Sequence, residues 1–131
     1  MREHAPAFTE RWVPAAPGDD AILVHGDIHS DHLYGAGEPW LPCALIDFGD
    51  ARASNAFYEL GALQMGMFDA DRGQLAAFLD GYGWDTGDGA AFARGALATA
   101  LLHDFDLFSE HRALLAGAND LDALAELLFA P

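Results

Sequence analysis

Residues 21–48 contain two short apolar runs, and each run leads into acidic and histidine side chains. The first run, residues 21–24, reads Ala-Ile-Leu-Val, which is typical of a strand buried on both faces. Gly and Pro in segment 35–39 provide turn chemistry, so segments 33–34 and 43–47 are predicted to pair as a hairpin. The expected β-structure is therefore one strand and one short hairpin.

After the hairpin, apolar residues recur at helical spacing. We predict a helix over residues 58–68 and a second helix that begins at the capping residue Asp71. A long third helix, capped by Asp88, is predicted through residues 90–107, and a last one over residues 121–129. The fold class that follows is α+β, with the short hairpin packed on a mostly helical bundle of at least four helices.

The length of 131 residues fits a single domain. Residues 1–20 are predicted to form an N-terminal helix and connector, with a short helix or loop around residues 7–12, and residues 21–131 the main lobe. The sequence has no run of about 18 apolar residues and no apolar signal core, so we expect a cytoplasmic protein.

The chain is strongly acidic, with 21 Asp and Glu against 6 basic residues and a formal net charge of −15. Nucleic acids and anionic membranes both attract clustered Lys and Arg, so we expect neither of them as a partner. None of the basic residues is Lys, which excludes Schiff-base chemistry. We expect a small-molecule substrate, and a cationic one would suit this charge.

Chemically active residues are densest directly after the first apolar run, where residues 25–32 read His-Gly-Asp-Ile-His-Ser-Asp-His. The second apolar run ends at residues 46–50, Ile-Asp-Phe-Gly-Asp, in which a carboxylate is followed by a glycine that permits a sharp turn. Loops held at strand ends are where binding and catalytic sites are commonly built. These two loops are therefore the candidate functional site.

Together the two loops resemble the catalytic and metal-binding loops of the aminoglycoside phosphotransferase and choline kinase-like family, which has a protein-kinase-like fold. Residues 25–27 match the family's His-Gly-Asp, and residues 46–50 match its later Ile-Asp-Phe-Gly motif. Residues 54–60, Ser-Asn-Ala-Phe-Tyr-Glu-Leu, are similar to the segment that follows in the family. The resemblance covers about residues 21–65 and implies a kinase-like C-terminal lobe for residues 21–131.

The resemblance implies transfer of the ATP γ-phosphoryl group to a hydroxyl of a small molecule, aminoglycoside-like or other, with Mg²⁺. It puts Asp27 in the catalytic role, as the carboxylate that orients the alcohol and accepts its proton. It makes Asp47 a Mg²⁺ ligand. The family's second metal ligand, an Asn, falls at His32, although imidazole is a less usual partner of Mg²⁺. A site that joins Asp47 and His32 is expected to bind Mn²⁺ or Zn²⁺ more tightly than Mg²⁺.

Other residues of this region are expected to support the site. His25 is predicted to hold its loop by hydrogen bonds, and Gly26 and Gly49 to shape the two loops. Glu59 is predicted to anchor a loop. Asp50 is either an acid that faces the substrate or the N-cap of the next helix, and both interpretations stay open.

The region after residue 100 carries further polar side chains. His103 and His111 are expected on the surface of the long helix. Asp104, Asp106 and Glu110 are predicted to form an acidic helix face, which is either solvated or lines a pocket for a cationic substrate.

A whole enzyme of this family also has a nucleotide-binding N-terminal lobe with a phosphate-gripping Lys, and the sequence reaches His25 too early to include one. We therefore expect an incomplete or weakly active enzyme, whose isolated chain binds ATP with a millimolar Kd or weaker.

One alternative is a non-catalytic module that forms a homodimer or binds a partner such as the missing lobe. A second is a metal-dependent hydrolase, because Asp27, His29, Asp31 and His32 resemble the His-x-His-x-Asp-His motif of metallo-β-lactamase-like enzymes.

Overall fold

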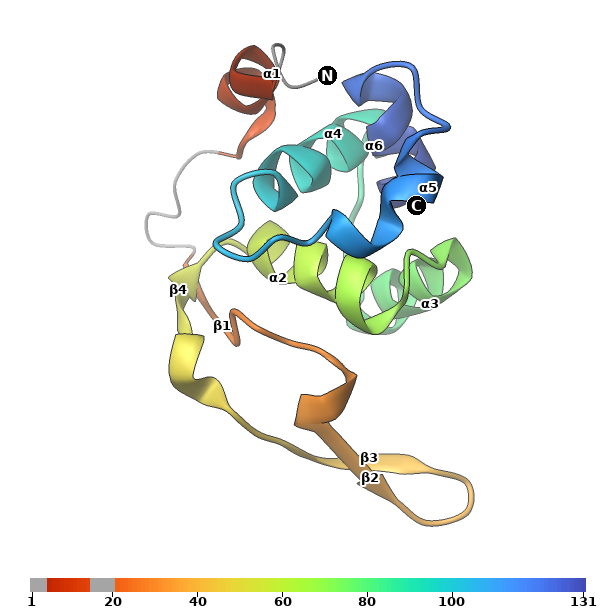
Figure 1. Cartoon of the computed structure of the whole chain (residues 1–131). Coiled ribbons are helices and arrows are strands. Elements are labelled where there is room, and N and C mark those ends of the chain that lie inside the picture. The colour runs from red at the N-terminus through yellow and green to blue at the C-terminus, as the bar shows by residue number, and fades with distance from the viewer. Residues whose placement is uncertain (1–4, 15–20) are drawn as a thin grey trace.

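Two parts make up the described chain, which covers residues 5–14 and 21–131 of this computed structural model (Figure 1). A β segment, residues 21–54, carries both polar loops, and a helical body comprises residues 5–14 and 55–131. This mixture confirms the α+β class. The helices of the body are α1 (Ala5–Trp12), α2 (Ala56–Ala62) with its π-helical continuation η3 (Leu63–Met67), α3 (Arg72–Tyr82), α4 (Gly89–Ala100), η4 (Ser109–His111), α5 (Arg112–Leu115) and α6 (Leu121–Phe129).

Helix α4 forms the centre of the helical body, because α1, α2 and α6 all pack against it. Most of its side chains are small, which lets its neighbours approach closely. A Cβ added at Gly61 of α2 would lie only 3.0 Å from the Cβ of Ala100. Leu97 of α4, Leu60 of α2 and Leu128 of α6 are all 0 % exposed. Each such side chain contributes about 1.5–3 kcal/mol when it leaves water, so the hydrophobic core lies here.

The helix starts follow the capping residues that the sequence indicates. Asp71 Oδ1 accepts a hydrogen bond of 2.9 Å from the Gln74 amide at the start of α3. Asp88 Oδ1 accepts one of 3.0 Å from Ala90 at the start of α4. These contacts satisfy amides that have no partner within the helix, and the two capping predictions are confirmed. The predicted last helix is also confirmed as α6.

The β segment consists of two separate antiparallel pairs. Strand β1 (Ile22–Val24) pairs with β4 (Arg52–Ser54), and β2 (Leu33–Ala36) pairs with β3 (Leu41–Leu45). The β2–β3 pair confirms the predicted hairpin and extends it toward the turn. Strand β4 is not among the predicted elements. It closes the β segment by bringing the chain after the second polar loop back beside the strand that precedes the first.

Two expectations for the β segment are wrong. Strand β1 is not buried on both faces: Leu23 is 73 % exposed, and only Val24 is buried. The hairpin does not pack on the helical bundle but projects away from it, and most of its residues are exposed (Figure 1). Tyr34, Trp40 and Leu41 stay exposed there, and the two strands satisfy their inner backbone groups by pairing with each other rather than with the body.

The long helix predicted over residues 90–107 ends at Ala100. Beyond it, the His103 Nδ1 atom accepts a hydrogen bond of 3.2 Å from the Phe105 amide, and Asp106 Oδ1 accepts one of 3.1 Å from Phe108. Such local side-chain contacts compete with the helical pattern. The acidic helix face predicted here is therefore wrong, because its members lie on a loop and in η4.

The predicted N-terminal helix is present as α1, which packs on α4 and buries Phe8. Residues 15–20 of the predicted connector lie outside the described residues. In the ranges 5–14 and 21–131, no helix has the length and apolar character needed to cross a membrane.

Candidate functional site

The His-Gly-Asp loop begins directly after β1, and its histidine faces inward. His25 is buried, and its Nε2 atom donates a hydrogen bond of 2.7 Å to the Ile46 carbonyl. Its Nδ1 atom accepts a longer contact of 3.4 Å from the Asp27 amide. His25 thus joins the two polar loops and orients the backbone of Asp27. Its supporting role in a functional site stays a prediction.

A carboxylate of the helical body also holds this loop. Glu59 of α2 accepts hydrogen bonds through Oε2 from the amides of His25 and Gly26. Hydrogen bonds to an ionised acceptor are stronger than those between neutral groups. The predicted anchoring role of Glu59 is confirmed, and its hydrogen bonds connect the first polar loop to α2.

The loop needs glycine at position 26. Gly26 has φ +86°, and a Cβ there would lie 2.5 Å from the Asp50 carbonyl oxygen. The two polar loops therefore touch backbone to backbone. Gly49 differs, since its φ is not in the left-handed region and a Cβ would make only an ordinary contact of 3.5 Å with Asp47. Neither the backbone conformation nor the space at position 49 requires glycine, and the part of Gly49 in shaping the loop stays a prediction.

The sharp turn of the second loop occurs at Asp47 itself. This residue has φ 63° and ψ 58°, a left-handed conformation that costs most residues about 1–2 kcal/mol. It follows β3 and precedes the short 3-10 helix η2 (Phe48–Asp50). The Ile46 amide donates a hydrogen bond of 3.0 Å to the His32 carbonyl, which fixes Asp47 beside the first loop. Its side chain is 67 % exposed and faces solvent.

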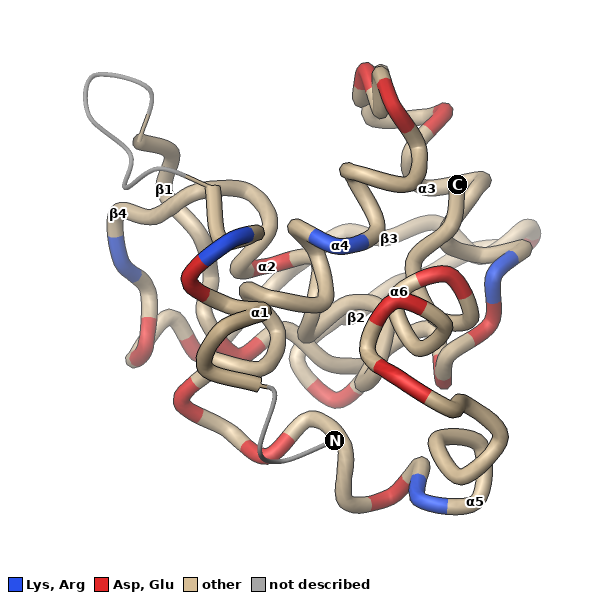
Figure 2. Tube along the Cα trace, turned by 90° about the horizontal axis from the view of Figure 1, so that it is seen from above, with Lys and Arg blue, Asp and Glu red and all other residues tan. Residues whose placement is uncertain are grey.

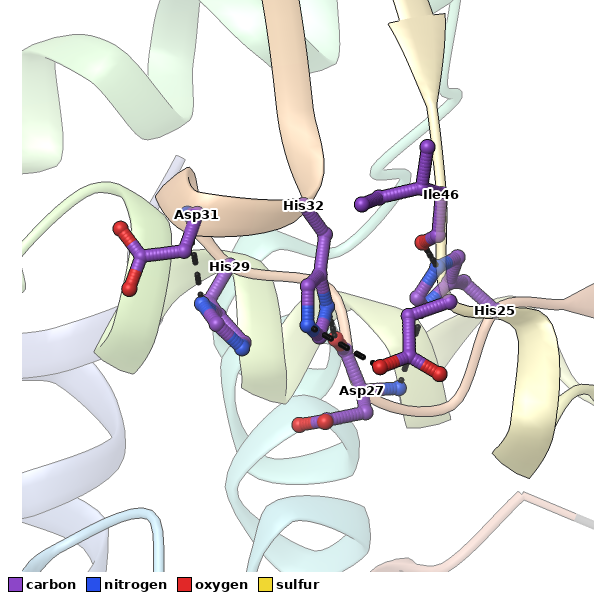
Figure 3. Close-up of polar contacts among 7 residues, drawn as sticks. His25, Asp27, His29, Asp31, His32 and Ile46 are labelled. Atoms are coloured by element: carbon purple, nitrogen blue, oxygen red, sulfur yellow. Dashed lines mark hydrogen bonds and ion pairs between the residues drawn. The ribbon is translucent and has the colours of Figure 1, made fainter.

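His32 lies between the two carboxylates. Its Nδ1 atom donates a hydrogen bond of 2.8 Å to the Asp27 carbonyl oxygen, so in the neutral ring Nε2 is the unprotonated atom (Figure 3). That Nε2 atom lies 3.7 Å from Asp47 Oδ2. Histidine ligands of metal ions commonly donate their other ring N–H to a carbonyl in this way. The structure therefore brings together the two residues predicted as metal ligands.

A second histidine approaches the same place. Ligating atoms of Asp27, His29 and His32 all lie within 4.8 Å of one another. His29 caps the 3-10 helix η1 (Ser30–His32), and Figure 3 shows the Asp31 carboxylate turned away from Asp27 and His32. The hydrolase-like set of four residues is thus incomplete. The spacing of His29 and His32, one 3-10 turn apart, is the sequence signal that indicates their proximity.

Asp50 lies at the end of η2 and is exposed. It is not the cap of the next helix, because Asn55 Oδ1 accepts the hydrogen bond from Tyr58 at the start of α2. The interpretation of Asp50 as a helix cap is therefore wrong. Its interpretation as an acid that faces the substrate remains a prediction.

A polar cluster that the sequence did not predict joins the loop after α4 to β4 and α2. Arg52 Nη1 is 2.6 Å from Asp104 Oδ2, and the Tyr58 hydroxyl is 3.3 Å from the same oxygen. The His103 ring stacks on Tyr58, with centroids 4.2 Å apart. The expected surface position of His103 is wrong, since within the described chain its Nε2 atom is buried and has no hydrogen-bond partner.

The charges of this cluster shift several pKa values. The hydrogen bond from Arg52 holds the pKa of Asp104 below its usual 3.8, and burial raises the pKa of Tyr58. Burial lowers the pKa of His103 from its usual 6.5, although the carboxylates of Asp104 and Asp27 act in the opposite direction. His103 is therefore kept neutral at physiological pH, within reach of the electrostatic field of Asp27.

His111 is also less exposed than expected. Its Nε2 atom donates a hydrogen bond of 2.7 Å to the Met65 carbonyl, which connects η4 to η3. Acidic residues lie on several helices and on many loops of the described chain, whereas arginines are few and scattered (Figure 2).

The sequence model of one known family covers most of this chain. The model of the phosphotransferase enzyme family matches residues 2–98 of the 131, a stretch that includes both polar loops and ends inside α4. The match extends well beyond the region whose motifs carry the resemblance. The chain thus belongs to the phosphotransferase enzyme family, the group of aminoglycoside phosphotransferases and choline kinase-like proteins.

Proposed function

We propose that residues 21–131 form the C-terminal lobe of a kinase-like enzyme that transfers the ATP γ-phosphoryl group to a hydroxyl of a small molecule. The observation that carries this proposal is the convergence of Asp27 and Asp47 on His32 from two loops. Phosphoryl transfer depends chiefly on positioning and electrostatics, and loops held this tightly are suited to both.

Asp27 is the residue proposed to orient the acceptor hydroxyl and take its proton. Its backbone is held on both sides, by His25 at the amide and by His32 at the carbonyl. Its side chain is only half-buried, so a substrate can reach it. A carboxylate fixed through its backbone but open to solvent is the arrangement that a general base requires.

The donor atoms of Asp47 and His32 fit a divalent cation. The exposed carboxylate offers oxygen, and His32 offers the unprotonated Nε2 atom 3.7 Å away. Mg²⁺ in kinases of this type neutralises charge on the nucleotide phosphates. With one carboxylate and one imidazole, the site leaves most coordination positions to water and phosphate oxygens, and it favours Mn²⁺ over Mg²⁺.

The acceptor is proposed to be cationic, such as an amino sugar or another amine. The formal net charge of −15 attracts cations over a distance. Asp50 and Asp106 are exposed, and neither makes an ion pair among the described residues. Asp104, by contrast, is already paired with Arg52.

Metal binding gives the sharpest test of these assignments. Titration with Mn²⁺, followed by electron paramagnetic resonance, should show binding that Asp47→Asn abolishes and Asp27→Asn weakens only modestly. Binding should also weaken as the pH falls, because a protonated imidazole cannot ligate. Unchanged Mn²⁺ affinity in Asp47→Asn would contradict the site assignment.

Catalysis is tested by transfer of radiolabelled phosphate from Mg-ATP to a panel of amine-bearing alcohols. Any transfer that the chain supports should fall about 100-fold or more in Asp27→Asn, because general-base catalysis contributes roughly that much. Transfer at the same rate in wild type and Asp27→Asn would show that Asp27 is not the base. Asp31→Asn is the matched control, since it removes a neighbouring exposed carboxylate.

A self-associating module is the second candidate function, and one observation favours it. Several large apolar side chains of the β segment are exposed: Leu23, Tyr34, Trp40, Leu41, Ile46 and Phe48. A homodimer interface is one way to remove such side chains from water. We propose a homodimer across this surface. Sedimentation velocity should then show a dimer that Leu23→Asp with Leu41→Asp dissociates, and a wild-type monomer at all concentrations would exclude it.

A further inference from the structure

His29 has no part in the proposed transfer, yet it lies in the middle of the site. Its ring centroid is 3.7 Å from that of His32, and both rings face the Asp27 side chain (Figure 3). We propose that Asp27, His29 and His32 form a binding site for a transition-metal ion such as Zn²⁺, which shares His32 with the Asp47–His32 pair but takes its other ligands from Asp27 and His29.

Local geometry brings the two histidines together. His29 caps η1 and His32 ends it. A 3-10 helix has three residues per turn, so side chains three positions apart lie directly above one another. Asp27 precedes them on a loop whose backbone is held by His25 and Glu59. The three ligands therefore come from one short and well-anchored stretch of chain.

The nitrogen atoms of both rings are available to a metal ion. His32 donates through Nδ1 to the Asp27 carbonyl, which leaves the lone pair of Nε2 free. His29 Nδ1 accepts a contact of 3.4 Å from the Asp31 amide, longer than the usual range of about 2.7–3.2 Å. Coordination through Nε2 requires the His29 proton to move to Nδ1, which gives up the contact with the Asp31 amide, and the length of that contact keeps the loss small.

The distances require only a small closure. Ligands that share one Zn²⁺ ion at about 2.0–2.1 Å lie about 3.3 Å apart in a tetrahedral site. The three ligating atoms already lie within 4.8 Å of one another, and none of the three residues is fully buried. Side-chain rotations can therefore close the remaining gap. Two imidazoles and one carboxylate select Zn²⁺ or Co²⁺ over Mg²⁺, which prefers oxygen ligands.

This site would regulate the enzyme, a consequence that rests on the proposed function. A bound Zn²⁺ ion occupies the Asp27 carboxylate, which then cannot take the proton of the acceptor hydroxyl. It also engages His32, so the transition-metal ion and the cation at Asp47 compete for one imidazole. Zn²⁺ is therefore expected to inhibit transfer, whereas Mg²⁺ supports it.

Direct binding of Co²⁺ tests the site without any measurement of activity. The full chain would carry Cys43→Ser, because the exposed Cys43 thiol is itself a soft-metal ligand. Visible absorption of bound Co²⁺, displaced by Zn²⁺, reports affinity and ligand geometry. His29→Gln should weaken Co²⁺ binding about tenfold or more, since even residues that only orient a ligand cost that much. Asp31→Asn should leave it within about twofold.

Two results would overturn the proposal. One is Co²⁺ affinity in His29→Gln equal to that of the parent protein, or no Co²⁺ binding by the parent at all. The other is a loss in Asp47→Asn as large as that in His29→Gln, which would place the ion at the Asp47–His32 pair. Far-UV circular dichroism of each variant confirms that it is folded. If His29→Gln loses Co²⁺ but keeps Mn²⁺, the site holds whether or not phosphoryl transfer is ever detected.

Discussion

The helical body and the β segment are built on different principles. The body buries its side chains in one core around α4, where Leu97 and Leu128 are 0 % exposed. The β segment buries little beyond Val24, His25 and Gly26, and its hairpin projects into solvent. What holds the segment is a short series of polar contacts and one backbone-to-backbone approach.

The difference shows how a site can be both accurate and accessible. Hydrophobic burial would stabilise the loops but would also cover Asp27 and Asp47. Hydrogen bonds that Glu59 accepts from backbone amides, and that His25 and His32 donate to backbone carbonyls, fix the backbone instead and leave the carboxylates open to a substrate or an ion. If this division is correct, mutations in the body should change stability, and mutations in the polar contacts should change binding.

The largest effect is expected in the core. Leu97→Ala should lower the free energy of unfolding by about 2–5 kcal/mol, because it leaves a cavity in α4. Urea denaturation measures the change. The matched variant Leu23→Ala in the β segment should change stability by only about 0.5 kcal/mol, since Leu23 is 73 % exposed. Equal losses in the two variants would remove the distinction between the two regions.

The next largest effect is expected at the approach of the two loops. Gly26→Ala should cost about 1–3 kcal/mol and weaken Mn²⁺ binding, because the methyl group would meet the Asp50 carbonyl. Gly37→Ala is the control: its φ is +92°, but a Cβ there has its nearest neighbour at 3.4 Å. It carries similar backbone strain without the clash and should leave Mn²⁺ binding unchanged. Retained binding in Gly26→Ala would mean that the loops can separate without loss of the site.

A smaller effect is expected at the anchor. Glu59→Gln should destabilise the chain by about 1 kcal/mol, because a neutral oxygen accepts more weakly from the amides of His25 and Gly26. Hydrogen exchange at those two amides should accelerate more than exchange in α4. Glu126→Gln makes the same charge change at an exposed position of α6 and should leave both amides protected.

The smallest effect concerns pH. Burial holds the pKa of folded His103 below its usual 6.5, so as the pH falls below about 6.5 the unfolded chain binds a proton more readily than the folded one. The free energy of unfolding should therefore decline on acidification through this range, and His103 should contribute nothing above it. His103→Gln should show a shallower decline than wild type between pH 8 and pH 5. If the unfolding free energies of wild type and His103→Gln decline in parallel with pH, His103 is exposed to solvent in the folded protein.

Local signals were sufficient for much of this structure. Asp71 and Asp88 begin helices because a capping carboxylate satisfies amides only two or three residues away. The hairpin forms across a Gly/Pro turn, and its pairing depends on neighbouring residues. The motifs around Asp27 and Asp47 also identified the two loops, because the residues that characterise the family lie in short contiguous motifs.

Long-range contacts account for the errors. Strand β4 forms because Arg52–Ser54 pairs with β1, about thirty residues earlier in the chain, and no local sequence pattern predicts that pairing. Helix α4 stops at Ala100, and the loop beyond it lets Asp104 reach Arg52 and His103 stack on Tyr58. The exposure of Leu23 likewise depends on which elements cover β1 in space.

By itself, then, the sequence determined the α+β class, the starts of α3 and α4, the hairpin and the two loops that carry Asp27 and Asp47. Only the tertiary structure decided that His32 stands between these carboxylates, that His29 joins them, and that Glu59 and Gly26 lock the loops together. The physical reason is the separation in sequence between the residues that interact. Caps and turns are settled within a few residues, whereas a shared site is settled by contacts between segments that meet only when the whole chain has folded.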